Sequence, residues 1–105
     1  MKPKLIDNYT FGSVLIDFKN HLASVSDIEI KLSNREFELM DYFIRHTGEI
    51  IHRDDLLDKV WGYDVPPTTR TVDNFILELR KKLEDNPSNP KHILTVRGVG
   101  YKFVD

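Results

Sequence analysis

The sequence contains no cysteine among its 105 residues, which excludes a disulfide scaffold, a thiolate metal cage and a cysteine nucleophile. Long hydrophobic runs are also absent: none approaches the roughly 20 residues that span a bilayer, and residues 1–4 lead into no signal-peptide apolar region. Neither sign of charge dominates, since 15 Lys and Arg stand against 17 Asp and Glu. We therefore expect a soluble, cytoplasmic protein, and the net charge of −2 gives no sign of a nucleic-acid partner.

Charge is nevertheless distributed unevenly along the chain. Residues 1–69 carry 8 basic and 12 acidic side chains, a net charge of −4. Residues 70–104 carry 7 basic and 4 acidic side chains, a net charge of +3. Such segregation can mark one interaction face, although surface charges also cluster by chance.

Period-two runs of apolar residues predict a small antiparallel sheet of three or four strands in about residues 5–32. Val14, Ile16 and Phe18 alternate to one side, and residues 21–25 and 28–32 repeat the pattern after polar turns. This segment has no glycine-rich loop and no cluster of ionisable groups, so we interpret it as scaffold.

From Ser33 the apolar period changes to 3.6, and a core of three helices is expected in about residues 33–85. Ser33 and Glu36 have the capping-box spacing that begins a helix, and Gly48 suits a left-handed C-cap. The second helix is expected from about Arg53 to Val60. A third is expected from about Thr69 to Asp85, before a segment rich in proline and asparagine.

The third predicted helix has two distinct faces. Its apolar face, which we assign to the core, consists of Val72, Phe75, Ile76, Leu79 and Leu83. Its opposite face carries Arg70, Asn74, Leu77 and Lys81, flanked by Thr71, Asp73 and Glu78. Two strands follow in about residues 92–104, and the turn that joins them begins with Arg97.

The order sheet, helix, helix, loop, helix, hairpin predicts a single α+β domain over residues 1–105, a winged helix-turn-helix. In that motif one helix crosses the phosphate backbone, the next lies in the major groove, and the hairpin forms a wing. Arg97 stands at the tip of this wing, where a guanidinium suits the negative potential of a minor groove.

Four motifs, in this order and spacing, resemble the C-terminal effector domain of OmpR/PhoB-type response regulators. They are residues 32–39, residues 53–57 with 60–62, residues 70–73 with 79–84, and residues 95–101. The resemblance covers about residues 11–104. It implies a non-enzymatic output domain of a two-component system that binds specific double-stranded DNA to regulate transcription. The receiver domain of that family is missing from this chain.

The resemblance also implies roles for individual residues. The third helix reads bases in the major groove, and Arg97 enters the minor groove. The phosphate-contact candidates are Trp61, Arg70, Thr71, Lys81, Thr95 and Tyr101. The residues at or beside base-facing positions are Asn74, Leu77, Glu78 and Arg80. The loop that faces RNA polymerase comprises Gly62, Tyr63, Asp64, Val65, Pro66, Pro67, Thr68 and Thr69.

The partners implied are direct-repeat DNA and RNA polymerase. The chain is expected to be either an excised fragment or a stand-alone effector, and if it is a fragment, a receiver domain with its upstream histidine kinase is a further partner. We expect the isolated domain to be monomeric and to bind DNA as a head-to-tail pair. No cofactor is expected. The four histidines lack the spacing of a zinc site; they are His21, His46, His52 and His92. An enzyme would need a convergent set of ionisable groups, and the sequence shows none.

Several alternatives stay open at this point. An apolar Leu77 opposite the core face has three explanations: the helix phase is misplaced, the residue lies in an interface with another protein, or it contacts a thymine methyl group. Glu78 could accept a hydrogen bond from the amino group of cytosine. Together these two residues also allow a protein-interaction module that does not bind DNA. Trp61 suits packing as well as phosphate contact. His52 stands where Ser or Thr would cap the second helix, so a weak cap is expected there.

Overall fold

The computed structural model describes residues 7–62 and 68–105, and it has the predicted α+β winged-helix architecture. A four-stranded antiparallel sheet comes first, in the order β1-β2-β3-β4. The strands are β1 (Asn8–Phe11), β2 (Val14–Asp17), β3 (Leu22–Val25) and β4 (Ile28–Ile30). Ile16 pairs with Ala23 in this sheet, and both are buried, so the period-two pattern faces the core as predicted.

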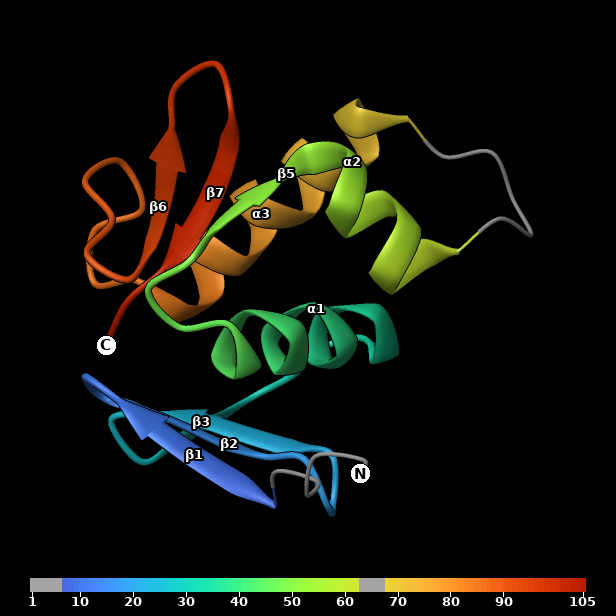
Figure 1. Cartoon of the computed structure of the whole chain (residues 1–105). Coiled ribbons are helices and arrows are strands. Elements are labelled where there is room, and N and C mark those ends of the chain that lie inside the picture. Colours follow the sequence, from blue (N-terminus) through green and yellow to red (C-terminus); the bar gives the residue numbers. More distant parts are fainter. Residues whose placement is uncertain (1–6, 63–67) are drawn as a thin grey trace.

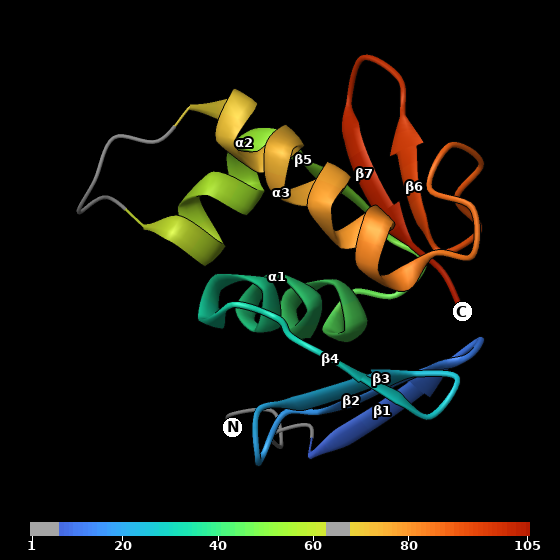
Figure 2. The same cartoon turned by 180° about the vertical axis from the view of Figure 1, so that it is seen from behind.

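Helix α1 (Asn34–Arg45) lies between this sheet and the rest of the molecule in both views (Figures 1 and 2). The predicted capping box is present: Glu36 N donates to Ser33 Oγ at 3.2 Å, and Ser33 N donates to Glu36 Oε1 at 2.7 Å. Lys82 Nζ also lies 2.7 Å from Glu36 Oε1, so the start of α1 is tied to a later helix. Gly48 has a φ of +85°, as expected of a left-handed residue beyond the helix end.

The second helix begins where predicted but changes its hydrogen-bonding pattern before it ends. Helix α2 (Arg53–Leu56) leads directly into the π-helix η1 (Leu57–Trp61), which Gly62 N closes by donating to Leu57 O at 3.0 Å. The expected single α-helix to Val60 is therefore corrected to two short helical segments. His52 is the N-cap of α2, and within the described part of the chain its side chain forms no capping hydrogen bond. The weak cap expected from a histidine in place of Ser or Thr is therefore present.

Helix α3 (Thr69–Leu83) ends two residues before the predicted end. Val72, Ile76, Leu79 and Leu83 are buried, and Phe75 is half-buried, so the predicted core face is confirmed. Beyond the helix, the buried carboxylate of Glu84 accepts hydrogen bonds from the backbone N–H groups of residues 91–93 at 2.8–3.0 Å. This carboxylate ties the end of α3 to the start of the wing. The helix ends at Leu83 because the backbone of Glu84 is extended, with φ −90° and ψ 142°.

The wing is a three-stranded sheet and not only the predicted hairpin. Strands β6 (Ile93–Val96) and β7 (Gly100–Phe103) form the hairpin, and β5 (Ile50–His52) pairs with the other side of β7. Strand β5 runs directly into α2 at Arg53, so the wing and the second helix are continuous (Figure 1). In the described segments, every helix is too short or too polar to traverse a bilayer.

Candidate nucleic-acid interface

The outward face of α3 carries polar and charged side chains along its whole length. Arg70, Asn74, Glu78 and Lys81 are exposed, as sequence periodicity predicted. Leu77 is 53% exposed on the same face, while its neighbour Ile76 is fully buried. The helix phase is therefore correct, and the explanation of Leu77 by a misplaced phase is excluded.

Two kinds of side chain lie on this face. Glu78 and Lys81 form an exposed ion pair of 3.3 Å across one helical turn, so part of the acidic charge is balanced locally. Arg70 and Asn74 make no side-chain hydrogen bond or ion pair with the residues that the structure describes. Their donors remain available to a partner.

Asp73 lies at the edge of this face and is held by two other elements. Arg53 of α2 donates to both carboxylate oxygens, with Nε 3.0 Å from Oδ1. The hydroxyl of Tyr101 on β7 donates to Oδ1 at 2.7 Å. Burial of the phenol, the hydrogen bond to Asp73 and the charge of that carboxylate raise the pKa of Tyr101 to about 12. The network joins α2, α3 and β7, and it pairs the negative charge of Asp73 with Arg53.

Arg80 joins α3 to the other strand of the hairpin. Its Nε donates to Ile93 O at 3.0 Å, and its terminal nitrogen donates to Thr95 Oγ1 at 2.7 Å. The guanidinium carbon lies 5.7 Å from the ring centroid of Tyr101. The structure thus brings Arg80, Thr95 and Tyr101 together. Thr95 and Tyr101, but not Arg80, line a cavity of about 280 Å³ between α3 and the wing, together with Arg53, Asp73 and Val99.

Arg97 lies at the tip of the wing, in the turn that joins β6 to β7. The turn is closed by Val99 N, which donates to Val96 O at 2.9 Å. The Arg97 side chain is exposed, and no residue in the described ranges pairs with it. Arg80 and Tyr101 bond the hairpin that carries Arg97 to α3.

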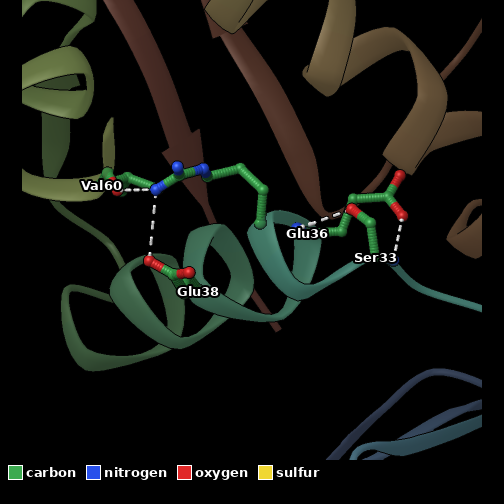
Figure 3. Close-up of polar contacts among 5 residues, drawn as sticks. Ser33, Glu36, Glu38 and Val60 are labelled. Atoms are coloured by element: carbon green, nitrogen blue, oxygen red, sulfur yellow. Dashed lines mark hydrogen bonds and ion pairs between the residues drawn. The ribbon is translucent and has the colours of Figure 1, made fainter. Parts of the chain in front are cut away.

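Trp61 is the last residue of η1 and is half-buried. Its ring meets Phe75 of α3 edge-on, with centroids 5.1 Å apart and an interplanar angle of 82°. The guanidinium of Arg35 lies 5.5 Å from the centroid of the same ring and donates to the carbonyl of Val60, a contact drawn in Figure 3. Trp61 therefore packs against Phe75 and Arg35, which is the packing role that its sequence position allowed.

Three residues of the predicted polymerase-facing loop are described, namely Gly62, Thr68 and Thr69, whereas residues 63–67 lie outside the described ranges. Thr68 is the N-cap of α3, and Thr71 N donates to its carbonyl at 2.9 Å. Among the described residues, no group of three or more His, Cys, Asp or Glu side chains is placed to hold a metal ion.

Sequence reasoning missed the importance of Arg53, Arg35 and β5. Arg53 belongs to a motif that supported the family resemblance, yet only the fold shows that it reaches Asp73, 20 residues later. No local signal indicated that Arg35 contacts Val60 and Trp61, because both lie more than 20 residues away. The run of residues 50–52 is too short to show a periodicity.

Residues 27–103 match the family described as "Transcriptional regulatory protein, C terminal". The chain is 43% identical over 92 residues to the sensory transduction protein RegX3 of Mycolicibacterium smegmatis, covering 88% of this chain and 40% of that protein. RegX3 of Mycobacterium leprae is 42% identical, with 46% of it covered. The chain thus spans less than half the length of these curated relatives.

Solved structures give the same grouping. Response regulator DrrB of Thermotoga maritima, an OmpR/PhoB homologue, superposes with a TM-score of 0.85 at 32% identity over 94% of this chain and 45% of its own. The DNA-binding domain of Klebsiella pneumoniae RstA in complex with the RstA box gives a TM-score of 0.80 at 36% identity, covering 94% of this chain and 98% of that one. The chain belongs to the family of C-terminal winged-helix DNA-binding domains of OmpR/PhoB response regulators, which are transcriptional regulators and not enzymes.

Proposed function

We propose that this domain binds double-stranded DNA in a sequence-specific way, with α3 in the major groove and the wing in the adjacent minor groove. The observation that carries the proposal is the exposed polar face of α3 beside the free Arg97 of the wing. A helix fits the major groove of B-DNA, and a guanidinium suits a narrow minor groove. The complex of the related RstA domain with the RstA box supports DNA binding by this domain.

In the major groove, Asn74, Leu77 and Glu78 face the base edges. An Asn side chain suits adenine, a Leu side chain suits a thymine methyl group, and a carboxylate accepts from the amino group of cytosine. Arg80 was also assigned to the bases from sequence. Because its guanidinium spans Ile93 O and Thr95 Oγ1, its reach toward a base requires those bonds to open.

Phosphate contacts come from residues on either side of α3. Arg70, Thr71 and Lys81 supply them from the helix, while Trp61 offers its indole N–H from η1. Thr95 contributes from the wing, where Arg80 donates to its oxygen and leaves its hydroxyl proton for a phosphate. Tyr101 donates its single hydroxyl proton to Asp73, so its contact with a phosphate requires that bond to open. The pairing of Asp73 with Arg53 lowers the repulsion that an isolated carboxylate beside phosphate would cause.

The remaining partners follow from family membership. We propose that two copies bind head to tail on a direct repeat, that residues 62–69 meet RNA polymerase, and that a receiver domain under a histidine kinase controls the assembly. Since the target is chromosomal DNA, the protein acts in the cytoplasm. The isolated domain is proposed to be monomeric.

Salt titration tests DNA binding directly. Affinity for a fluorescent direct-repeat duplex, measured by anisotropy, should fall linearly on a log–log plot against salt, with a slope of about −0.9 for each phosphate neutralised. Selection from a random DNA pool then gives the sequence that α3 reads. Affinity independent of salt, or a pool that never converges, would contradict the proposal.

The same titration separates DNA binding from the alternative of a protein-interaction module. That alternative is favoured only by the exposure of Leu77 in the middle of the α3 face. A module of this kind would show no affinity for a random duplex even at low salt. If the domain is a protein-interaction module, Leu77→Ala should weaken binding to the protein partner. If the domain binds DNA, the same change should relax the preference for thymine at one position.

A further inference from the structure

The C-terminal end of the second helix is capped by a side chain from a different helix. The last carbonyl groups of any helix lack donors within it. In η1 the Leu57 carbonyl is bonded to Gly62 N, and the Val60 carbonyl accepts a hydrogen bond from Arg35 of α1 (Figure 3). A positive guanidinium there also complements the negative end of the helix dipole.

The same guanidinium lies against the indole that follows Val60. Its carbon is 5.5 Å from the centroid of the Trp61 ring, and Phe75 of α3 meets that ring from another direction at 5.1 Å. Arg35 thus fixes both the backbone before Trp61 and the ring itself. Arginine suits this double contact, because its planar fork donates in plane while its face stacks on an aromatic ring.

The position of Arg35 is itself well defined. It is the second residue of α1, directly before Glu36, whose capping-box bonds to Ser33 fix the start of that helix. Lys82 of α3 pairs with the same Glu36 carboxylate. The Arg35 side chain is 36% exposed, and Glu38 lies 3.4 Å from it, so the fork is anchored at several points without being buried.

We propose that Arg35 is a positioning residue for DNA binding, which caps η1 at the Val60 carbonyl and holds the Trp61 indole in the orientation that meets phosphate. The inference rests on the proposed function in that Trp61 contacts DNA. It adds that a residue of α1, away from the α3 face and the wing, sets the affinity through Trp61. The Val60 carbonyl depends on an outside donor because it lies at a helix end, and π-helical turns such as η1 are frequent at functional sites.

The first test needs no DNA. Trp61 is the single tryptophan of the chain, so intrinsic fluorescence reports on it alone. Arg35→Met keeps an apolar stem but removes the donors and the charge, and it should shift the emission to longer wavelength and increase quenching by acrylamide. Glu38→Gln removes only the ion pair, and Arg45→Gln removes the same charge from the other end of α1. Both controls should retain the wild-type emission.

The second test asks whether Arg35 acts through Trp61. Arg35→Met should lower affinity for the selected duplex by about fivefold, in line with the strength of a partly exposed cation–π contact. In a Trp61→Phe background the same change should cost less than about twofold, because residues that act through one another are not additive. Arg45→Gln controls for the lost positive charge.

Unchanged Trp61 emission in Arg35→Met, or an equal loss of affinity in both backgrounds, would overturn the assignment. If Arg35→Met lacks a cooperative melt, Arg35→Lys replaces it, since lysine keeps the charge but not the planar fork. An emission identical to wild type would then reject the proposal. A wild-type chain that binds no duplex defeats the proposed function, and Arg35 is then judged on the fluorescence alone.

Discussion

Asp73 illustrates how a residue's neighbours change the meaning of its charge. On the sequence it is an acid beside a face expected to meet phosphate, where it would oppose binding. In the fold its carboxylate accepts from Arg53 and Tyr101, so it links three elements of the site. We therefore regard it as part of the frame that aligns the wing with α3.

Tyr101 reports on this frame through pH. Its pKa is raised from 10.0 to about 12, so the hydroxyl stabilises the fold fully below pH 10, and that stabilisation is lost as the pH rises through about 12. Tyr101→Phe should lower the free energy of unfolding at neutral pH by about 1.5 kcal/mol. The gap between wild type and variant should close between about pH 10 and pH 12. Urea unfolding followed by circular dichroism measures it, and a gap that stays constant over this range would contradict the expectation.

Arg97 allows a residue-scale test of minor-groove insertion. Arg97→Ala should weaken binding by about tenfold, or about 1.4 kcal/mol, on a duplex with a narrow A·T-rich flank. The loss on a G·C-rich flank should be much smaller. Arg70→Ala, which removes a proposed phosphate contact, should affect both duplexes equally. Anisotropy titrations measure the affinity for each of the two duplexes. An equal loss of affinity on both for Arg97→Ala would contradict insertion of the wing into the minor groove.

At the scale of elements, the sequence was informative wherever the pattern is local. The capping box at Ser33, the core face of α3 and the hairpin were all predictable, because each depends on residues within a few positions of one another. Strand β5 was missed because it is three residues long and depends on β7, about 50 positions later. The change from α-helix to π-helix at η1 was also missed, because it leaves the pattern of apolar residues unchanged and periodicity does not distinguish the two.

The candidate site divides in the same way. The exposed side of α3 was predictable from its 3.6 period, and Leu77 lies where that period places it. The Arg80–Thr95 and Asp73–Tyr101 bonds were not, since each joins residues 15 or more positions apart. Sequence therefore indicated which side chains gather near the site, but not that several of them bind each other.

Gly100 is the position in the wing where a side chain would most directly disturb the pairing of two strands. A Cβ at this position would lie 2.0 Å from Ile51 O on the neighbouring strand, so the β5–β7 pairing requires glycine there. Gly100→Ala should destabilise the domain by about 3 kcal/mol in urea unfolding. Gly48→Ala is the matched control: it meets no atom within 4 Å and should cost only the strain of a left-handed residue, about 1–2 kcal/mol. Equal losses for the two variants would show that β5 and β7 separate easily.

For the whole molecule, the near-neutral net charge conceals a basic C-terminal third. The N-terminal sheet region carries Lys19 and Lys31 beside its acids Asp7, Asp17, Asp27 and Glu29, and α1 separates that sheet from α3 and the wing (Figure 2). The basic residues of the C-terminal third lie on α3, on the wing and in the loop between them. A polyanion is therefore attracted toward α3 and the wing, which orients the encounter before any base is read.

The arrangement of two copies is a prediction at this scale. A duplex with two half-sites in the same orientation, one helical turn apart, should bind two copies more tightly than a single half-site binds one. Reversing one half-site should abolish that gain, because a head-to-tail contact cannot form on an inverted repeat. Gel-shift titration compares the three duplexes, with sedimentation of the free domain to establish its monomeric state. Equal affinity for direct and inverted repeats would rule out the head-to-tail pair.

The direct junction of β5 with α2 has a consequence for the DNA. Since no linker separates His52 from Arg53, and Asp73 bonds α2 and β7 to α3, the wing and α3 are joined at a defined spacing. If α3 and the wing enter adjacent grooves as proposed, the duplex has to adjust its groove widths to that spacing. Base pairs that no side chain touches should therefore affect affinity through their stiffness, and the domain would select DNA partly by how easily it deforms.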